Sequence, residues 1–292
     1  MKRWWTLWLW LWCSCVAWAQ PPVPLLWKVS DADNSVYLLG SMHLLTEADY
    51  PLASAVEAAF ADSAQLVFEV APDQLDPVQV GQALQRSALR RDGTTLQQSL
   101  PAATWQALQA YAQAQGMPVA ALQGYKAWFV ALMVMMAESQ KAGVNAALGL
   151  DQHFMQRAAQ AGKATSGLES AQAQIALFDG MGAQAQLQFL QETLADAPHT
   201  KTQMDALLAA WRQADEAALV RLGLDDLRRD YPALYQSVNL ERNRAWLPQV
   251  QALLRDSHHG NALVVVGALH LLGDDGLVRQ LARKGYRVQR LR

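Results

Sequence analysis

The sequence predicts an α/β fold of α+β character: a small, mostly parallel sheet is built from both ends of the chain, and a large helical insertion separates those ends. Strand-like apolar runs occur near both ends, as "VYLLG" (36–40), "QLVFEV" (65–70) and "ALVVVG" (262–267). The stretch of about 72–255 between them is rich in Ala and Gln, which favour helix over strand. Both end segments also carry the phrase Gly-x-x-His, as "GSMH" (40–43) and "GALH" (267–270).

The first 19 residues are typical of a secretory signal peptide. Lys2 and Arg3 precede an apolar stretch, and Ala17-Trp18-Ala19 supplies a small-residue cleavage pattern. This stretch is shorter than the roughly 20 residues that a membrane-spanning helix requires, so we expect no stable span after cleavage. The pattern favours an exported, periplasmic protein; the alternative is a lipid anchor at Cys15.

The mature chain, residues 20–292, is predicted to form a single domain. Both cysteines, Cys13 and Cys15, fall within the signal, so neither a disulfide nor thiol chemistry is expected in the mature protein. Loss of the signal leaves 22 basic and 26 acidic side chains, a net charge near −4. This balance gives no electrostatic reason to expect nucleic acid or an anionic membrane as a partner. The sequence does not predict an oligomeric state.

The N-terminal part indicates a hairpin followed by a βαβ unit. Strands are expected at 25–29 and 36–39, with turn residues at 31–34 between them. Apolar residues recur at helical spacing over 52–60, and a compact strand follows at 65–70. Strand, helix and strand in this order favour a parallel pair.

The insertion is expected to be helical almost throughout. A helix is predicted over 99–116, with Ser99 as its cap and Gly116 as its stop. The segment 127–137 is apolar on all sides, which predicts a buried helix whose methionines fill the core. Residues 164–170 are either a short strand or an extended link. Further helices are expected at 151–162, 171–178, 184–195, 202–213 and 234–255.

The C-terminal part returns to alternating strand and helix. The run 262–267 is typical of a strand buried on both faces. A helix is expected over 274–285 and a final strand over 286–291.

The repeated Gly-x-x-His phrase predicts a site at the carboxyl edge of the sheet. A glycine lets the backbone turn sharply at the end of a strand, and the histidine is then displayed above that edge, where open α/β sheets place ligands. His43 and His270 are therefore expected to converge, with Glu69 at the end of a third strand. A buried carboxylate requires a cation, a metal or hydrogen-bond donors. Two imidazoles and one carboxylate are a plausible divalent-metal site.

Other polar residues are weaker candidates. Glu169 follows the possible strand at 164–170 and either faces the same crevice or belongs to a first helical turn. Asp151 lies at a predicted helix start, where Asp is commonly an N-cap, and His153 lies two residues later. Arg242 and Asn243 lie on a helix with other charged residues. Exposed loop positions are expected for His199, His258 and His259.

Taken together, these motifs resemble the TraB/GumN family, which is related to the Tiki proteins. The resemblance covers about residues 25–292 and is carried by "GSMH", "FEV", "GLDQHF", "LES", "ERNRAW" and "GALHLLGDDG". It implies a metal-dependent peptidase of the manganese or cobalt type, as described for the Tiki branch, with zinc also possible. In bacterial plasmid members it implies a connection with peptide pheromone shutdown. His43, Glu69, Arg242 and His270 match the residues of the family motifs.

The leading hypothesis is an exported metal-dependent hydrolase, a peptidase acting on peptides or protein termini. His43, Glu69 and His270 would hold the divalent metal, which acidifies water and polarises a carbonyl. Glu169 would take the proton from water, and Arg242 would stabilise an oxyanion or bind a substrate carboxylate. A second assignment makes Glu69 the base and gives Asp151 or His153 to the metal. A different class of function is a non-catalytic periplasmic protein that sequesters a peptide or haem.

Overall fold

The computed structural model describes residues 21–256 and 260–292, so the predicted signal and the histidines at 258 and 259 lie outside the described residues. A six-stranded sheet forms the centre, in the order β4-β3-β5-β2-β1-β6. The strands are β1 (Leu26–Ser30), β2 (Ser35–Ser41), β3 (Gln65–Val70), β4 (Ala164–Glu169), β5 (Ala262–Gly267) and β6 (Arg287–Leu291).

Strands from the two ends of the chain pair with each other within this sheet, which confirms the predicted fold class. β2 pairs with β5 in parallel, with Gly40 opposite Val266, and β3 lies on the other side of β5, also in parallel. β4 adds a fourth parallel strand beside β3, whereas β1 pairs antiparallel with both β2 and β6. The carboxyl ends of β4, β3, β5 and β2 therefore lie along one edge.

The helical part surrounds this sheet and extends away from it. The helices are α1 (Ser54–Asp62), α2 (Pro77–Ala88), α3 (Leu96–Ser99), α4 (Ala102–Ala114), α5 (Ala127–Lys141), α6 (Leu150–Gln160), α7 (Ala171–Asp179), α8 (Ala183–Asp196), α9 (Thr200–Arg212), α10 (Glu216–Val220), α11 (Asp226–Asp230), α12 (Pro232–Tyr235), α13 (Glu241–Arg255) and α14 (Leu277–Arg283). Two π-helical turns, Arg221–Asp225 and Gln236–Leu240, connect α10 to α11 and α12 to α13.

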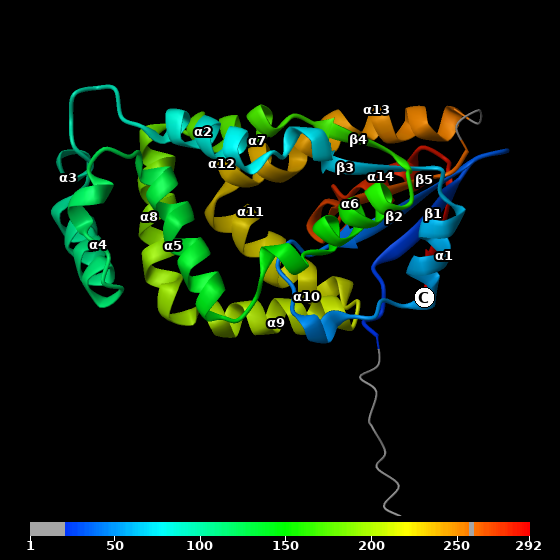
Figure 1. Cartoon of the computed structure of the whole chain (residues 1–292), viewed down its shortest axis with the longest axis horizontal. Coiled ribbons are helices and arrows are strands. Elements are labelled where there is room, and N and C mark those ends of the chain that lie inside the picture. The colour runs from blue at the N-terminus through cyan, green and yellow to red at the C-terminus, as the bar shows by residue number, and fades with distance from the viewer. Residues whose placement is uncertain (1–20, 257–259) are drawn as a thin grey trace, which may run out of the picture.

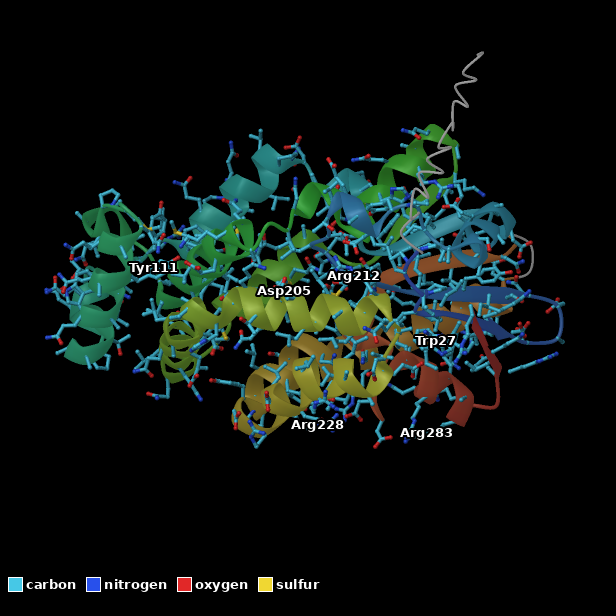
Figure 2. All side chains as sticks on the ribbon, turned by 90° about the horizontal axis from the view of Figure 1, so that it is seen from below. Trp27, Tyr111, Asp205, Arg212, Arg228 and Arg283 are labelled. Carbon is cyan, nitrogen blue, oxygen red and sulfur yellow. The ribbon has the colours of Figure 1, made fainter. Side chains whose placement is uncertain are left out.

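Two clusters of buried apolar residues stabilise the structure. The larger one packs α1, α6, α13 and α14 against the sheet, and the strand residues 262–266 are all buried within it, as their sequence predicted. The smaller one joins α4, α5 and α8 through residues such as Leu108, Val130 and Leu190. Figure 1 shows α3, α4, α5 and α8 at the end of the molecule away from the sheet. In Figure 2, Tyr111 of α4 and Trp27 of β1 lie correspondingly far apart.

Several local predictions are wrong. Ser99 ends α3 and caps nothing, because the N-cap of α4 is Pro101. The first half of α5, residues 127–134, has no exposed side chain, as predicted, and the helix packs against α7, α8 and α9. Its next turn departs from the prediction, because Met135 and Met136 are 45 % and 64 % exposed. These two methionines therefore do not fill the core. The segment 216–230 is helical, as expected of the insertion as a whole, but no bounds were predicted for it.

Gly40 has a different role from the predicted turn. It lies inside β2, and a Cβ there would come within 3.0 Å of the Leu25 side chain and 3.2 Å of Ala268. Glycine is therefore required at this position by close packing between neighbouring segments.

In the part of the chain that the structure describes, no helix combines the length and the apolar character that crossing a membrane requires.

Candidate functional site

The four parallel strands bring the predicted site residues to one edge of the sheet. His43 lies two residues beyond β2, His270 ends the single helical turn after β5, and Glu69 and Glu169 lie at the ends of β3 and β4. The Nε2 atom of His43 is 3.9 Å from Oε1 of Glu69, and Nε2 of His270 is 4.0 Å from the same oxygen. The two Gly-x-x-His histidines thus meet at one carboxylate.

Arg242, from α13, lies in the middle of this group. Its Nε and Nη2 atoms bind Glu169 at 2.6–3.1 Å, and Nη2 also donates to Oε2 of Glu69 at 2.6 Å. Nη1 donates to the carbonyl of Val238 at 3.1 Å and lies 3.0 Å from Nε2 of His270. Its side chain, like those of both glutamates, is only 12 % exposed. All five N–H donors of this guanidinium are therefore engaged.

The Nδ1 atom of each imidazole contacts a side-chain oxygen, which orients the ring. Nδ1 of His270 lies 2.8 Å from Oδ1 of Asn243. The amide nitrogen of Asn243 donates to the carbonyl of Asp275 at 2.9 Å, so its oxygen must accept, and His270 carries its proton on Nδ1. The lone pair of His270 is consequently on Nε2 and faces the centre of the site, where it accepts from Arg242.

The partner of His43 is Asp151, because the start of α6 lies against the segment after β2. The N–H of Leu150 donates to the carbonyl of Met42 at 3.0 Å, and Oδ1 of Asp151 is then 3.2 Å from Nδ1 of His43. Gly149 allows this approach, since a Cβ there would collide with the carbonyl of His43.

Burial and the neighbouring charges shift the pKa values of His270, His43 and Glu69 in different directions. Burial lowers the pKa of His270 to about 3. Partial desolvation of the His43 ring opposes a charge there, although 57 % of its side chain stays exposed; the hydrogen bond to Asp151 and the charge of Glu69 outweigh this and raise its pKa to about 9. Burial would raise the pKa of Glu69, yet the positive groups around it lower that pKa to about 2. At neutral pH, Glu69 is ionised, His270 is neutral and the metal-free His43 is protonated.

These shifts predict an acid-sensitive fold. Between pH 6.5 and pH 3 the unfolded chain binds a proton at His270 that the folded protein does not, so the free energy of unfolding should fall by about 1.4 kcal/mol per pH unit as pH decreases. Glu69 adds a second proton below about pH 4.5. The contribution of His43 to the free energy of unfolding has the opposite pH dependence. This stabilisation is fully present below pH 6.5 and is lost as the pH rises through about 9.

Urea denaturation of the metal-free protein over this pH range measures the effect. A His270→Asn variant has no proton to take up at this position. Its free energy of unfolding should therefore fall less steeply with decreasing pH, by the amount that corresponds to one proton, although the variant is less stable at every pH. Parallel slopes for the two proteins would show that His270 does not carry the effect.

Gly267 forms the floor beneath the three converging side chains. A Cβ at this residue would lie 3.2 Å from Oε1 of Glu69, 3.5 Å from Cδ2 of His270 and 3.5 Å from Nε2 of His43. Its N–H donates to Oε1 of Glu69 at 2.8 Å. Glycine thus leaves open a cradle bounded by two imidazoles and one carboxylate.

The donor set fits a divalent cation in chemical type and direction. Imidazole nitrogens whose other ring nitrogen is held by an oxygen, together with a carboxylate, are typical of transition-metal sites. No three His, Cys, Asp or Glu side chains in residues 21–256 and 260–292 are already spaced to hold an ion. The Nε2 atoms of His43 and His270 lie 3.9 and 4.0 Å from Oε1 of Glu69, and an N–H of Arg242 occupies the lone pair of His270. An ion bound at Nε2 of His270 would require this N–H of Arg242 to move away.

A pocket of about 300 Å³ opens beside the cradle. His43, Glu69, Arg242 and His270 line its polar end. The remainder is mostly aliphatic and is formed by Met42, Leu44, Met204, Leu207, Leu219 and Leu269. A ligand in this pocket would place an apolar group next to the polar cluster.

A profile of the TraB/PrgY/gumN family matches residues 25–290. The chain belongs to the TraB/PrgY/gumN family. Among its relatives are the uncharacterized proteins YbaP of Escherichia coli (strain K12) and of Shigella flexneri, each 28 % identical over 176 residues. The match covers 60 % of this chain and 64 % of either YbaP. No solved structure shows a significant match.

The other predicted site residues of this TraB/PrgY/gumN chain do not line the pocket. His153 lies on α6 against the ring of Tyr50, its Nε2 is buried without a partner among the described residues, and it does not line the pocket. His199 is exposed, as expected. Glu169 faces Arg242, and neither it nor Asp151 is among the residues that line the pocket.

Two contributors to the site were not recognised as such in the sequence. Trp246 is fully buried; its ring centroid lies 4.5 Å from that of His270, with the two rings tilted by 52°, and 4.5 Å from the guanidinium carbon of Arg242. Asn243 fixes the tautomer of His270. Both residues stand in "ERNRAW", where the four-residue spacing of Arg242 and Trp246 was the available signal.

Proposed function

We propose that this protein is a divalent-metal-dependent hydrolase that cleaves peptides. One observation carries the proposal: two imidazole Nε2 atoms, each held through Nδ1 by an oxygen, converge on Oε1 of Glu69 above an open cradle at Gly267. The family membership supports it through the peptidase branch that the motifs resemble. Manganese or cobalt is the expected ion, with zinc as the alternative.

His43, Glu69 and His270 would hold the ion. When bound, it supplies Lewis acidity, which polarises a carbonyl and lowers the pKa of water. Asp151 and Asn243 keep the Nε2 lone pairs of the two imidazoles directed inward. Oε1 of Glu69 accepts the N–H of Gly267 and keeps a second lone pair for the ion.

We assign to Arg242 the stabilisation of charge on the substrate. The N–H that it places on Nε2 of His270 is the one that an ion at that nitrogen would displace. This donor is then free at the wall of the pocket, where it is placed to bind the oxygen of a polarised carbonyl. The remaining four donors keep the guanidinium fixed on Val238, Glu69 and Glu169.

Glu169 is better placed to hold Arg242 than to receive a proton from water. Its two oxygens bind the guanidinium, and it does not line the pocket. We therefore propose a positioning role for Glu169 in place of the general-base role that the sequence suggested.

Elemental analysis and a peptide-library assay test this function. We expect one equivalent of a first-row metal in the mature protein, and cleavage in the presence of manganese, cobalt or zinc. His43→Ala and His270→Ala should each lose the metal and reduce cleavage at least about 100-fold, because each removes one of three ligands. The control is His199→Ala, an exposed histidine away from the site, which should behave as wild type.

Two results would contradict the proposal. Full metal content in both histidine variants would exclude this site. Peptide binding without cleavage under all three metals would instead favour a protein that sequesters peptides.

A further inference from the structure

A second hollow adjoins the pocket. It has a volume of about 460 Å³ and lies between α5, α8, α9 and the segment α10–α12; we call it the acidic groove. Met204 and Leu207 of α9 line both the pocket and the acidic groove, so the two hollows adjoin at these side chains. Figure 1 shows α9 running from the far helical end, where α5 and α8 stand, toward the sheet.

Exposed apolar side chains line part of the acidic groove. Met135 of α5 is 45 % exposed and Leu222 is 41 % exposed, and both belong to the small set of large apolar residues exposed in the described chain. Phe189 and Leu234 add further apolar surface. Contiguous apolar surface that is left open to water commonly marks a binding site.

The charge of the acidic groove has one sign. Glu138, Glu192, Asp196 and Asp226 line it, and no Lys, Arg or His is among its described lining residues. Glu138 is neutralised by Lys141, and Asp226 by Arg229. Glu192 and Asp196 have no basic side chain within 4.0 Å among the residues that the structure describes; Glu192 instead accepts a hydrogen bond from Tyr231.

Glu192 and Asp196 are four residues apart on α8 and therefore lie on the same face of that helix. Two uncompensated carboxylates on one helix face repel each other and attract a cation. The acidic groove thus combines apolar contacts with two negative charges that a ligand can pair, directly alongside the pocket.

We propose that the acidic groove binds the extended part of a peptide substrate in which apolar side chains adjoin positively charged groups. This inference rests on the proposed function, because the groove adjoins the pocket at Met204 and Leu207, and a ligand that fills both is then the substrate. The peptide would place one apolar side chain in the pocket beside His43 and Glu69, and would direct its lysine or arginine side chains, or its amino terminus, toward Glu192 and Asp196. The protein is thus a hydrolase with a preference for cationic, apolar peptides.

Binding to the metal-free protein tests the proposal without turnover. The probes are two fluorescein-labelled octapeptides that share three alternating leucines, one with two lysines at one end and the other with two glutamates there. Fluorescence anisotropy should give at least about tenfold tighter binding of the lysine peptide, since two ion pairs distinguish the probes. The difference should shrink as salt is added. Equal affinity for both peptides would overturn the proposal.

Charge-neutral variants locate the effect. Glu192→Gln/Asp196→Asn should remove most of the preference for the lysine peptide. The control is Asp205→Asn, an acid of α9 that pairs with Lys201 and does not line the groove; it is labelled in Figure 2. A preference that persists in the double variant, or one lost equally in the control, would overturn the proposal.

A second pair of variants does not depend on the acidic residues. Met135→Lys places a positive charge in the apolar lining and should weaken binding of the lysine peptide about tenfold. Met136→Lys changes the neighbouring methionine, which is more exposed and lies outside the groove, and should leave binding unchanged. Equal effects of the two variants would overturn the proposal.

The outcome is separable from that of the proposed function. A protein that binds the lysine peptide selectively but cleaves nothing retains the groove and loses the hydrolase assignment. A protein that cleaves peptides without regard to their charge retains the hydrolase assignment and loses the groove.

Discussion

Replacement of Arg242 by alanine should lower the free energy of unfolding by about 3–5 kcal/mol. Glu69 and Glu169 are each 12 % exposed and both pair with this guanidinium. His43 also lies 3.9 Å from Glu69, so Glu69 loses part of its charge compensation in the variant and Glu169 loses its paired arginine. Without it, two buried carboxylates lie close together and His270 loses the donor on its Nε2. Urea denaturation at pH 7, analysed with far-UV circular dichroism, measures the change.

Two further variants identify the cause. Arg242→Ala/Glu169→Gln removes one of the stranded charges and should be more stable than Arg242→Ala alone, because less uncompensated charge remains buried. Arg229→Ala removes an exposed arginine that pairs with Asp226 and Asp230, and should match wild type within error. If Arg242→Ala is as stable as Arg229→Ala, the buried charges are not coupled in the way the geometry indicates.

The arrangement of the sheet could be predicted because its strands carry their own signals. The runs at 36–39 and 262–267 are apolar enough to identify buried strands, and their shared Gly-x-x-His ending placed His43 and His270 at the same edge. Parallel pairing of β2 with β5 then brings two segments from opposite ends of the chain into contact. The approach of Glu69 followed from the position of β3 on the other side of β5.

Features that depend on tertiary packing could not be predicted in this way. The segment 221–225 adopts a π-helical turn whose Gly223 packs tightly against Leu269, and no periodicity in the sequence marks such a turn. The exposure of Met135 and Met136 depends on which face of α5 meets α8. An apolar sequence alone does not distinguish a core face from the lining of a groove.

The site residues, too, could be predicted only in part from the sequence. Residue types and spacing were sufficient to select His43, Glu69 and His270 as converging residues. They did not reveal that Arg242 would lie between the glutamates, or that Asn243 would determine which nitrogen of His270 carries the proton. Both depend on which face of α13 is turned toward the strand ends, and that orientation is set by burial of Trp246.

Gly267→Ala should weaken metal binding while leaving the fold intact. The backbone of Gly267 has φ −50° and ψ 132°, a conformation that alanine adopts without strain. The added methyl group would stand in the cradle, 3.2 Å from Oε1 of Glu69 and 3.5 Å from Nε2 of His43, in the space that an ion between these donors needs. We expect metal affinity to fall at least about tenfold and peptide cleavage about 100-fold.

Isothermal titration with manganese or cobalt measures the affinity, and a matched glycine separates the cradle from general effects of the substitution. Gly81 lies within α2 with nothing within 4 Å of a Cβ, so Gly81→Ala should bind metal as wild type does and be slightly more stable, because alanine favours helix. Both variants add one methyl group, but only that of Gly267→Ala lies in the cradle. Wild-type metal affinity in Gly267→Ala would therefore mean that the ion is not held between His43, Glu69 and His270, even if each of those side chains is needed for activity.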